Sequence, residues 1–110
     1  MSIRLQKVND LLRDEAGKII LAELRGGEAL VTITRAEASR TLEHATIFIS
    51  VMPKHQARNV LSKIRQQIYF LQQAFNKRLN LRVVPKVRFE VDTSIAHLAR
   101  IEQLLEKTGK

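Results

Sequence analysis

Apolar residues recur at three- and four-residue steps in three stretches of the chain, which is the spacing of one face of an α-helix. The first stretch spans residues 4–24 and stops before a Gly-Gly pair, a strong signal for the end of a helix. The second spans residues 56–79, where one apolar stripe continues without Gly or Pro. The third spans residues 95–107 and follows three good N-cap residues. We therefore expect three amphipathic helices, the second being one long helix or two nearly in line.

Alternating apolar and polar residues predict strands in three shorter segments. Residues 29–38 and 44–51 are joined by a link in which we expect Ser39 to close the turn, and the two strands can pair antiparallel through it. Residues 87–92 come after the long helix, so the second and third strands can form a parallel crossover. Phe48 points away from the apolar run of its strand, and we expect it to lie under a helix.

The resulting order, α-β-β-α-(α)-β-α, predicts an α+β fold. A three-stranded sheet with helices packed on one face is its simplest two-layer arrangement. With 110 residues the chain has room for one domain, which we assign to residues 1–110. The last predicted helix would be capped by Asp92, a structural role.

The composition excludes several classes of protein. The absence of cysteine rules out disulfides, thiolate catalysis and cysteine-based zinc sites. The chain holds no apolar run long enough to cross a membrane, and charges occupy the place of a signal peptide's apolar stretch. We therefore expect a soluble protein of the cytoplasm that does not associate with membranes.

The positive charge is concentrated in the middle of the chain. The net charge is +8, yet residues 1–43 carry seven basic and seven acidic groups. Residues 90–110 carry three basic and four acidic groups, whereas residues 44–89 carry nine basic groups and no acidic one. Such a segment produces a positive field that nothing nearby cancels, which favours a phosphate-rich partner. A basic face that only keeps the protein in solution is the alternative.

The candidate RNA-binding residues lie on the polar side of the long helix and just beyond it. Arginine can bind a phosphate through two parallel hydrogen bonds, and an exposed aromatic ring can stack on an unpaired base. We assign RNA contact to the following residues: Arg58, Lys63, Arg65, Tyr69, Lys77, Arg78, Arg82, Lys86 and Arg88.

Each of these assignments has a structural alternative. The first three cations can form a solvated helix face, although no acidic residue of the same helix is available to pair with them. Lys77, Arg78 and Arg82, at the helix C-terminus and beyond it, can instead complement the helix dipole. Tyr69 can lie flat on its own helix.

Three groups of residues resemble the ribosome-binding factor A family, over roughly residues 3–106. Residues 31–39 and 45–50 read Val-Thr-Ile-Thr-Arg-Ala-Glu-Ala-Ser and Ala-Thr-Ile-Phe-Ile-Ser. Residues 77–82 read Lys-Arg-Leu-Asn-Leu-Arg. Residues 81–94 are similar to the family pattern Leu-Arg-x-x-Pro-x-Leu-x-Phe-x-x-Asp-x-Ser, which is specific to it.

The resemblance implies a type II KH-like fold and a function in ribosome maturation. Such a protein binds the small ribosomal subunit and its rRNA late in assembly, assists maturation of the 5′ end of that rRNA, and matters for growth in the cold. It would act as a monomer without a cofactor. As in the family, the Gly-x-x-Gly loop of ordinary KH domains is absent.

Two departures from the family pattern concern the long helix. The Ala-x-Gly motif at its usual kink is replaced by Gln67, Ile68 and Tyr69, which predicts a milder bend or one continuous helix. An arginine often found shortly after the kink is replaced by Gln72.

No motif points to catalysis or metal binding. His44, His55 and His97 lack metal-ligand spacing, and neither a phosphate-binding glycine loop nor a nucleophile elbow is present. We therefore expect neither an enzyme nor a metal site. Two other functions stay open, namely a less specific RNA- or DNA-binding protein and a basic domain that binds an acidic protein partner.

Overall fold

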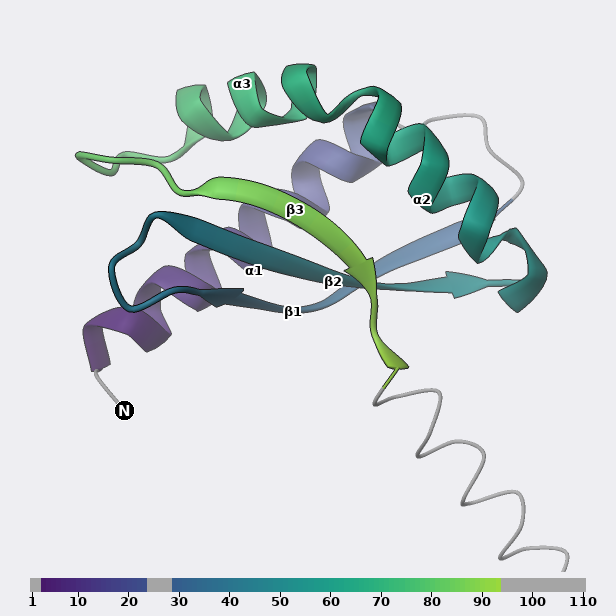
Figure 1. Ribbon diagram of the computed structural model, residues 1–110, viewed down its shortest axis with the longest axis horizontal. Helices are drawn as coiled ribbons and strands as arrows, with labels where there is room; N and C mark the ends of the chain where they lie inside the picture. Colours follow the sequence, from purple (N-terminus) through teal and green to yellow (C-terminus); the bar gives the residue numbers. More distant parts are fainter. Residues whose placement is uncertain (1–2, 24–28, 94–110) are drawn as a thin grey trace, which may run out of the picture.

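The computed structural model describes residues 3–23 and 29–93, which form a sheet covered on one face by helices (Figure 1). The elements are α1 (Ile3–Glu23), β1 (Leu30–Ala38), β2 (His44–Met52), the 3-10 helix η1 (Lys54–Gln56), α2 (Ala57–Gln66), α3 (Ile68–Arg78) and β3 (Lys86–Val91). The predicted helix over 95–107 lies outside the described residues. The order of the other elements agrees with the order predicted from the hydrophobic pattern.

The three strands are arranged in the order β1-β2-β3. β1 pairs with β2 antiparallel, and β2 pairs with β3 parallel, so both predicted connections are confirmed. Ser39 closes the turn between β1 and β2: its Oγ accepts hydrogen bonds from the backbone N–H groups of Glu43 at 3.1 Å and His44 at 3.2 Å. The predicted structural role of Ser39 is thus confirmed.

A β-bulge in β1 changes which residues face the helices. The register shifts between Ile33, which pairs with Ile49, and Arg35, which pairs with Phe48. Thr34 is the extra residue, so Ala36 rather than Arg35 turns toward the core and is buried. Without the bulge, strict alternation would carry the Arg35 guanidinium into the apolar layer.

One apolar core joins the helical layer to the sheet. Its largest fully buried side chains include Leu12 of α1, Ile47 of β2 and Phe75 of α3. The Phe75 ring packs against Phe89 of β3 with 6.4 Å between ring centroids. Because α2 and α3 are fixed by this core, their polar faces have defined positions at the surface.

The central helical segment is broken at Gln67, between α2 and α3. Gln67 has φ −104° and ψ 13°, and the ribbon changes direction there (Figure 1). The continuous helix that we considered is therefore wrong. The Gln67 N–H lies 3.0 Å from the carbonyl oxygen of Ile64 and 3.2 Å from that of Lys63, a tightened turn that needs neither glycine nor proline. On either side of the break, α2 packs on β2 and β3, and α3 packs on β3 and α1.

Candidate nucleic-acid interface

The sequence of α2 separates cations from the core by helical spacing. Val60 and Ile64, four residues apart, are buried against the sheet, whereas Arg58, Lys63 and Arg65 are exposed. Among the described residues, none of these three cations takes part in an ion pair. Their charges are therefore available to a partner outside the chain.

Arg58 and Arg65 lie seven residues apart on α2 and line the same open groove. Its apolar part is formed by Ala57 and Leu61 of α2 and by Val91 at the end of β3. Ser62 and Gln66 complete the lining, but Lys63 does not belong to it. The groove thus combines an apolar lining with two guanidinium groups, which suits a ligand that carries both phosphates and flat apolar surfaces.

Tyr69 and Phe70 lie in the first turn of α3, which begins at Ile68 after the break. The two residues are 67% and 69% exposed, so both rings are accessible to a partner. Sequence reasoning missed Phe70, because a phenylalanine in an amphipathic helix is normally part of the core. A signal was available: Phe70 directly precedes Leu71, and only the second of these neighbours can occupy the apolar stripe.

The cations near the end of α3 have different surroundings. Lys77 and Arg82 are exposed, and within the described residues neither forms an ion pair. Arg78 donates a hydrogen bond from Nε to Glu15 Oε2 of α1 at 2.6 Å. This hydrogen bond is the largest cause that lowers the pKa of the Glu15 carboxyl, with help from Lys18. Arg78 is therefore already paired with a carboxylate of the same chain.

Lys86 and Arg88 lie on β3 with their side chains exposed, while their neighbours Val87 and Phe89 are buried. They consequently occupy the sheet face opposite the described helices, which we call the open face. Arg88 contacts Thr46 at 3.1 Å and lies 3.7 Å from a Glu90 carboxylate oxygen. The structure therefore places the predicted cations on two different faces. The other face is formed by α2 and α3, and we call it the helical face; neither of these two helices contains an acidic residue.

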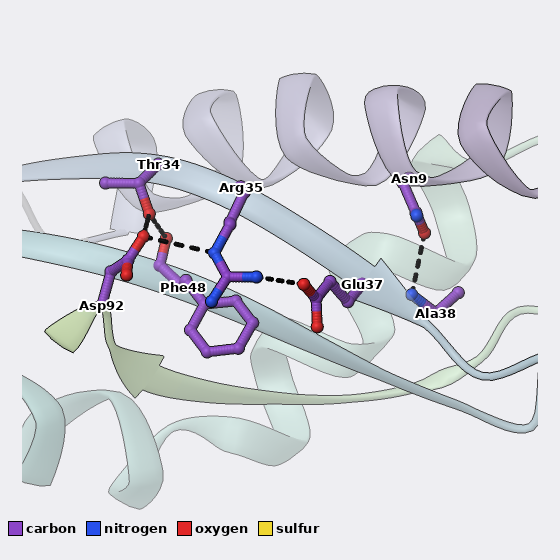
Figure 2. Close-up of polar contacts among 7 residues, drawn as sticks. All are labelled: Asn9, Thr34, Arg35, Glu37, Ala38, Phe48 and Asp92. Carbon is purple, nitrogen blue, oxygen red and sulfur yellow. Dashed lines mark hydrogen bonds and ion pairs between the residues drawn. The ribbon is translucent and has the colours of Figure 1, made fainter. Parts of the chain in front are cut away.

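A polar cluster occupies the open face near the bulge (Figure 2). The Thr34 hydroxyl lies 2.7 Å from Asp92 Oδ2, and Arg35 Nε donates to the same oxygen at 3.4 Å. The Arg35 guanidinium also pairs with Glu37 and lies 3.9 Å from the centroid of the Phe48 ring. The bulge turns Arg35 outward, and Arg35 covers the Phe48 ring. These contacts join β1, β2 and the end of β3, a structural role. None of the described helices covers Phe48, contrary to the expectation, and the predicted helix over 95–107 lies outside the described residues.

Asp92 is 3% exposed and joins the cluster through its carboxylate. Its backbone N–H donates to the Ile49 carbonyl oxygen at 2.8 Å and extends the β2–β3 pairing. The helix that Asp92 was expected to cap lies outside the described residues. Asp92 has a structural role, as expected. The role observed among the described residues is a different one: the Asp92 carboxylate attaches the end of β3 to β1.

The described part of the chain holds no group of three His, Cys, Asp or Glu side chains that could bind a metal ion. His44 and His55 are exposed, and His97 is outside this part. None of the described helices is long and apolar enough to cross a membrane.

Fold and surface together define a class of protein, a KH-like α+β domain with a basic helical face. The family model described as ribosome-binding factor A matches residues 4–105. Ribosome-binding factor A of Pseudomonas fluorescens is 34% identical to this chain over 108 residues, which cover 94% of this chain and 81% of the relative. The chain therefore belongs to the ribosome-binding factor A family.

Solved structures show the same fold at low sequence identity. The crystal structure of ribosome-binding factor A from Thermus thermophilus has a TM-score of 0.69 at 16% identity, covering 79% of this chain and 93% of that one. A homology model of the Thermus thermophilus factor, fitted into the cryo-EM map of a complex between that factor and the 30S subunit, has a TM-score of 0.61 at 17% identity. It covers 74% of this chain and 88% of the Thermus chain.

Proposed function

We propose that this protein binds the small ribosomal subunit through its rRNA late in assembly and assists maturation of the 5′ end of that rRNA. Membership of the ribosome-binding factor A family supports the proposal, as does the 30S complex of the Thermus thermophilus relative. The observation that carries it is the surface of α2 and α3, where exposed cations and the Arg58–Arg65 groove occur without an acidic residue. A large polyanion is the partner that suits this surface.

The helical face suits rRNA better than the open face does. On the open face Lys86 and Arg88 share the surface with Glu37 and Glu90, and Arg88 is near one of these carboxylates. Phosphates approaching there would meet negative charge, whereas the residues of α2 itself are only cationic or neutral. We therefore assign the phosphate contacts to Arg58, Lys63, Arg65, Lys77 and Arg82, with Lys86, Arg88 and Arg78 outside the main contact surface.

The protein acts by binding alone, as a one-domain monomer in the cytoplasm, without catalysis or a cofactor. The absence of the Ala-x-Gly motif is the feature of the sequence that leaves a less specific nucleic-acid-binding protein open. The helix is nevertheless broken at Gln67, where the family has its kink, so this argument loses its basis. A need for the protein at low temperature is part of the proposal, tested by growth of a deletion strain in the cold.

Sedimentation of a cell lysate through a sucrose gradient tests the proposal, with and without RNase and over a series of salt concentrations. The protein should sediment with free small subunits, be depleted from translating ribosomes and be released by salt, because phosphate contacts weaken as salt rises. Presence in all RNA-containing fractions would indicate a general nucleic-acid-binding protein instead. A small complex that resists RNase would indicate an acidic protein partner.

A further inference from the structure

Two aromatic side chains are exposed side by side where the helical layer changes direction. Tyr69 and Phe70 lie immediately after the break at Gln67, and each is about two-thirds exposed, at 67% and 69%. Leaving two large apolar rings in water is unfavourable, and the core does not need them, because Leu71 and Phe75 already fill the space beneath α3. The pair therefore suits contact with a partner.

The arrangement of the two rings leaves flat surfaces available. Their centroids are 5.8 Å apart and their planes are inclined by 82°, an edge-to-face contact. In this geometry one ring turns its edge toward the other, so each ring keeps at least one face uncovered by its neighbour. Two such faces at a steep angle suit two separate flat groups better than one extended apolar surface.

The chemistry around the pair favours nucleotides. Arg65 precedes Tyr69 by four residues in the sequence. Gln66 precedes the aromatic pair and Gln73 follows it, and both are exposed. No acidic residue occurs in α2 or α3, so a phosphate backbone meets no repulsion from these helices. Exposed aromatic faces and exposed cations in one helical layer are the combination that binds single-stranded nucleic acid, because each base has a face that can stack.

We propose that Tyr69 and Phe70 stack on unpaired bases of a single-stranded RNA segment whose phosphates are bound by Arg58 and Arg65 in the groove. This inference rests on the proposed function and adds to it the form of RNA that is recognised. Bases inside a duplex are already stacked on one another, so they cannot use these rings. The helical face therefore selects unpaired RNA over duplex RNA.

Tyrosine fluorescence reports directly on this site, since Tyr69 is the only tyrosine and the chain has no tryptophan. The full-length protein is titrated with a short oligoadenylate and, separately, with an RNA duplex of the same length. Binding is measured in parallel by the anisotropy of fluorescently labelled RNA. The inference predicts that oligoadenylate quenches Tyr69 fluorescence strongly and that the duplex binds without comparable quenching.

The double variant Tyr69→Leu/Phe70→Leu removes the stacking faces and keeps apolar, helix-compatible side chains. Its affinity for oligoadenylate should fall by roughly 5- to 150-fold for each base that stacks, while its affinity for the duplex and its salt dependence stay unchanged. Leu21→Ala is the matched control, because Leu21 of α1 is 76% exposed and lies outside α2 and α3. This control should bind both RNAs like the wild type.

The outcomes separate the inference from the proposed function. If the wild type binds RNA without quenching, or the double variant binds oligoadenylate as well as the wild type does, the stacking role is wrong and the proposed function stands. If the wild type binds neither RNA nor small subunits, both are wrong. If the double variant keeps its RNA affinity but loses a partner that resists RNase, the pair is a protein-binding surface and the inference is overturned.

Discussion

The Gln72 side chain attaches α3 to the start of β3 through two backbone hydrogen bonds. The backbone N–H of Val87 donates to Gln72 Oε1 at 2.8 Å, and Gln72 Nε2 donates to the Pro85 carbonyl oxygen at 3.0 Å. Both Pro85 and Val87 are buried. The variant Gln72→Met keeps the length and helical preference of the side chain but removes both hydrogen bonds.

The expected loss of stability follows from the two backbone groups that would be left without these partners. Each buried polar group left unsatisfied costs about 1–3 kcal/mol. The two groups together would cost about 2–6 kcal/mol. β3 is an edge strand, so water can partly replace the glutamine, and we expect a loss in the lower half of this range, about 2–4 kcal/mol in the free energy of unfolding.

Urea unfolding followed by far-ultraviolet circular dichroism measures this loss. Gln73→Met is the matched control, since Gln73 is the neighbouring residue without a hydrogen bond to β3, and the same substitution there should change stability by less than about 0.5 kcal/mol. If the two variants are equally stable, Gln72 does not hold β3 to α3, and the reasoning is refuted.

Three further substitutions test separate parts of the structure, each by chemical or thermal unfolding. Thr34→Val removes the hydroxyl 2.7 Å from the buried Asp92 carboxylate and should lower stability by about 1.5–3 kcal/mol; unchanged stability would contradict a role for this contact. Gly17→Ala should raise stability by about 0.5–1 kcal/mol, because the added Cβ meets nothing within 4 Å and alanine favours the helix; a loss would contradict this packing. Arg78→Ala should destabilise the protein above the ordinary Glu15 pKa of 4.5 and progressively less as the pH falls below it, since the lowered pKa shows that the ionised carboxyl is the stabilised form. An effect that does not change with pH would show that Arg78 stabilises the fold in another way.

The helices and strands that could be predicted from the sequence are those whose pattern is local. The helix over 4–24 and the strand over 44–51 are observed within one residue at each end, as α1 (Ile3–Glu23) and β2 (His44–Met52). In both, one repeating set of apolar residues faces one core, so periodicity alone is sufficient.

The features that could not be predicted depend on contacts between distant segments. The bulge at Thr34 is stabilised by Asp92, 58 residues later in the chain. The break at Gln67 lies between two helices that each contact distant strands, and no Gly or Pro marks it in the sequence. The same applies to Arg78, whose partner Glu15 lies in a helix at the other end of the described chain. No local pattern contains this information.

The sequence was sufficient to predict which residues carry the positive charge of the candidate site, but not on which face of the protein each of them lies. The absence of acidic residues over 44–89 identified the basic segment. Its division between the helical face and the open face follows from the register of β3, where Lys86 and Arg88 alternate with buried residues on the opposite side. Alternation in a strand indicates that two residues share a face, but it does not show which face the helices cover.

Binding to purified small ribosomal subunits at several salt concentrations tests the central claim, that α2 carries the main phosphate contacts. Two variants with equal loss of charge are compared with the wild type: Arg58→Ala/Arg65→Ala on the helical face and Lys86→Ala/Arg88→Ala on the open face. The account predicts a large loss of affinity and a salt dependence weaker by about two phosphate contacts for the first variant, and a small change for the second. Equal losses for both variants, or a larger loss for the open-face variant, would contradict the assignment of the contacts to α2.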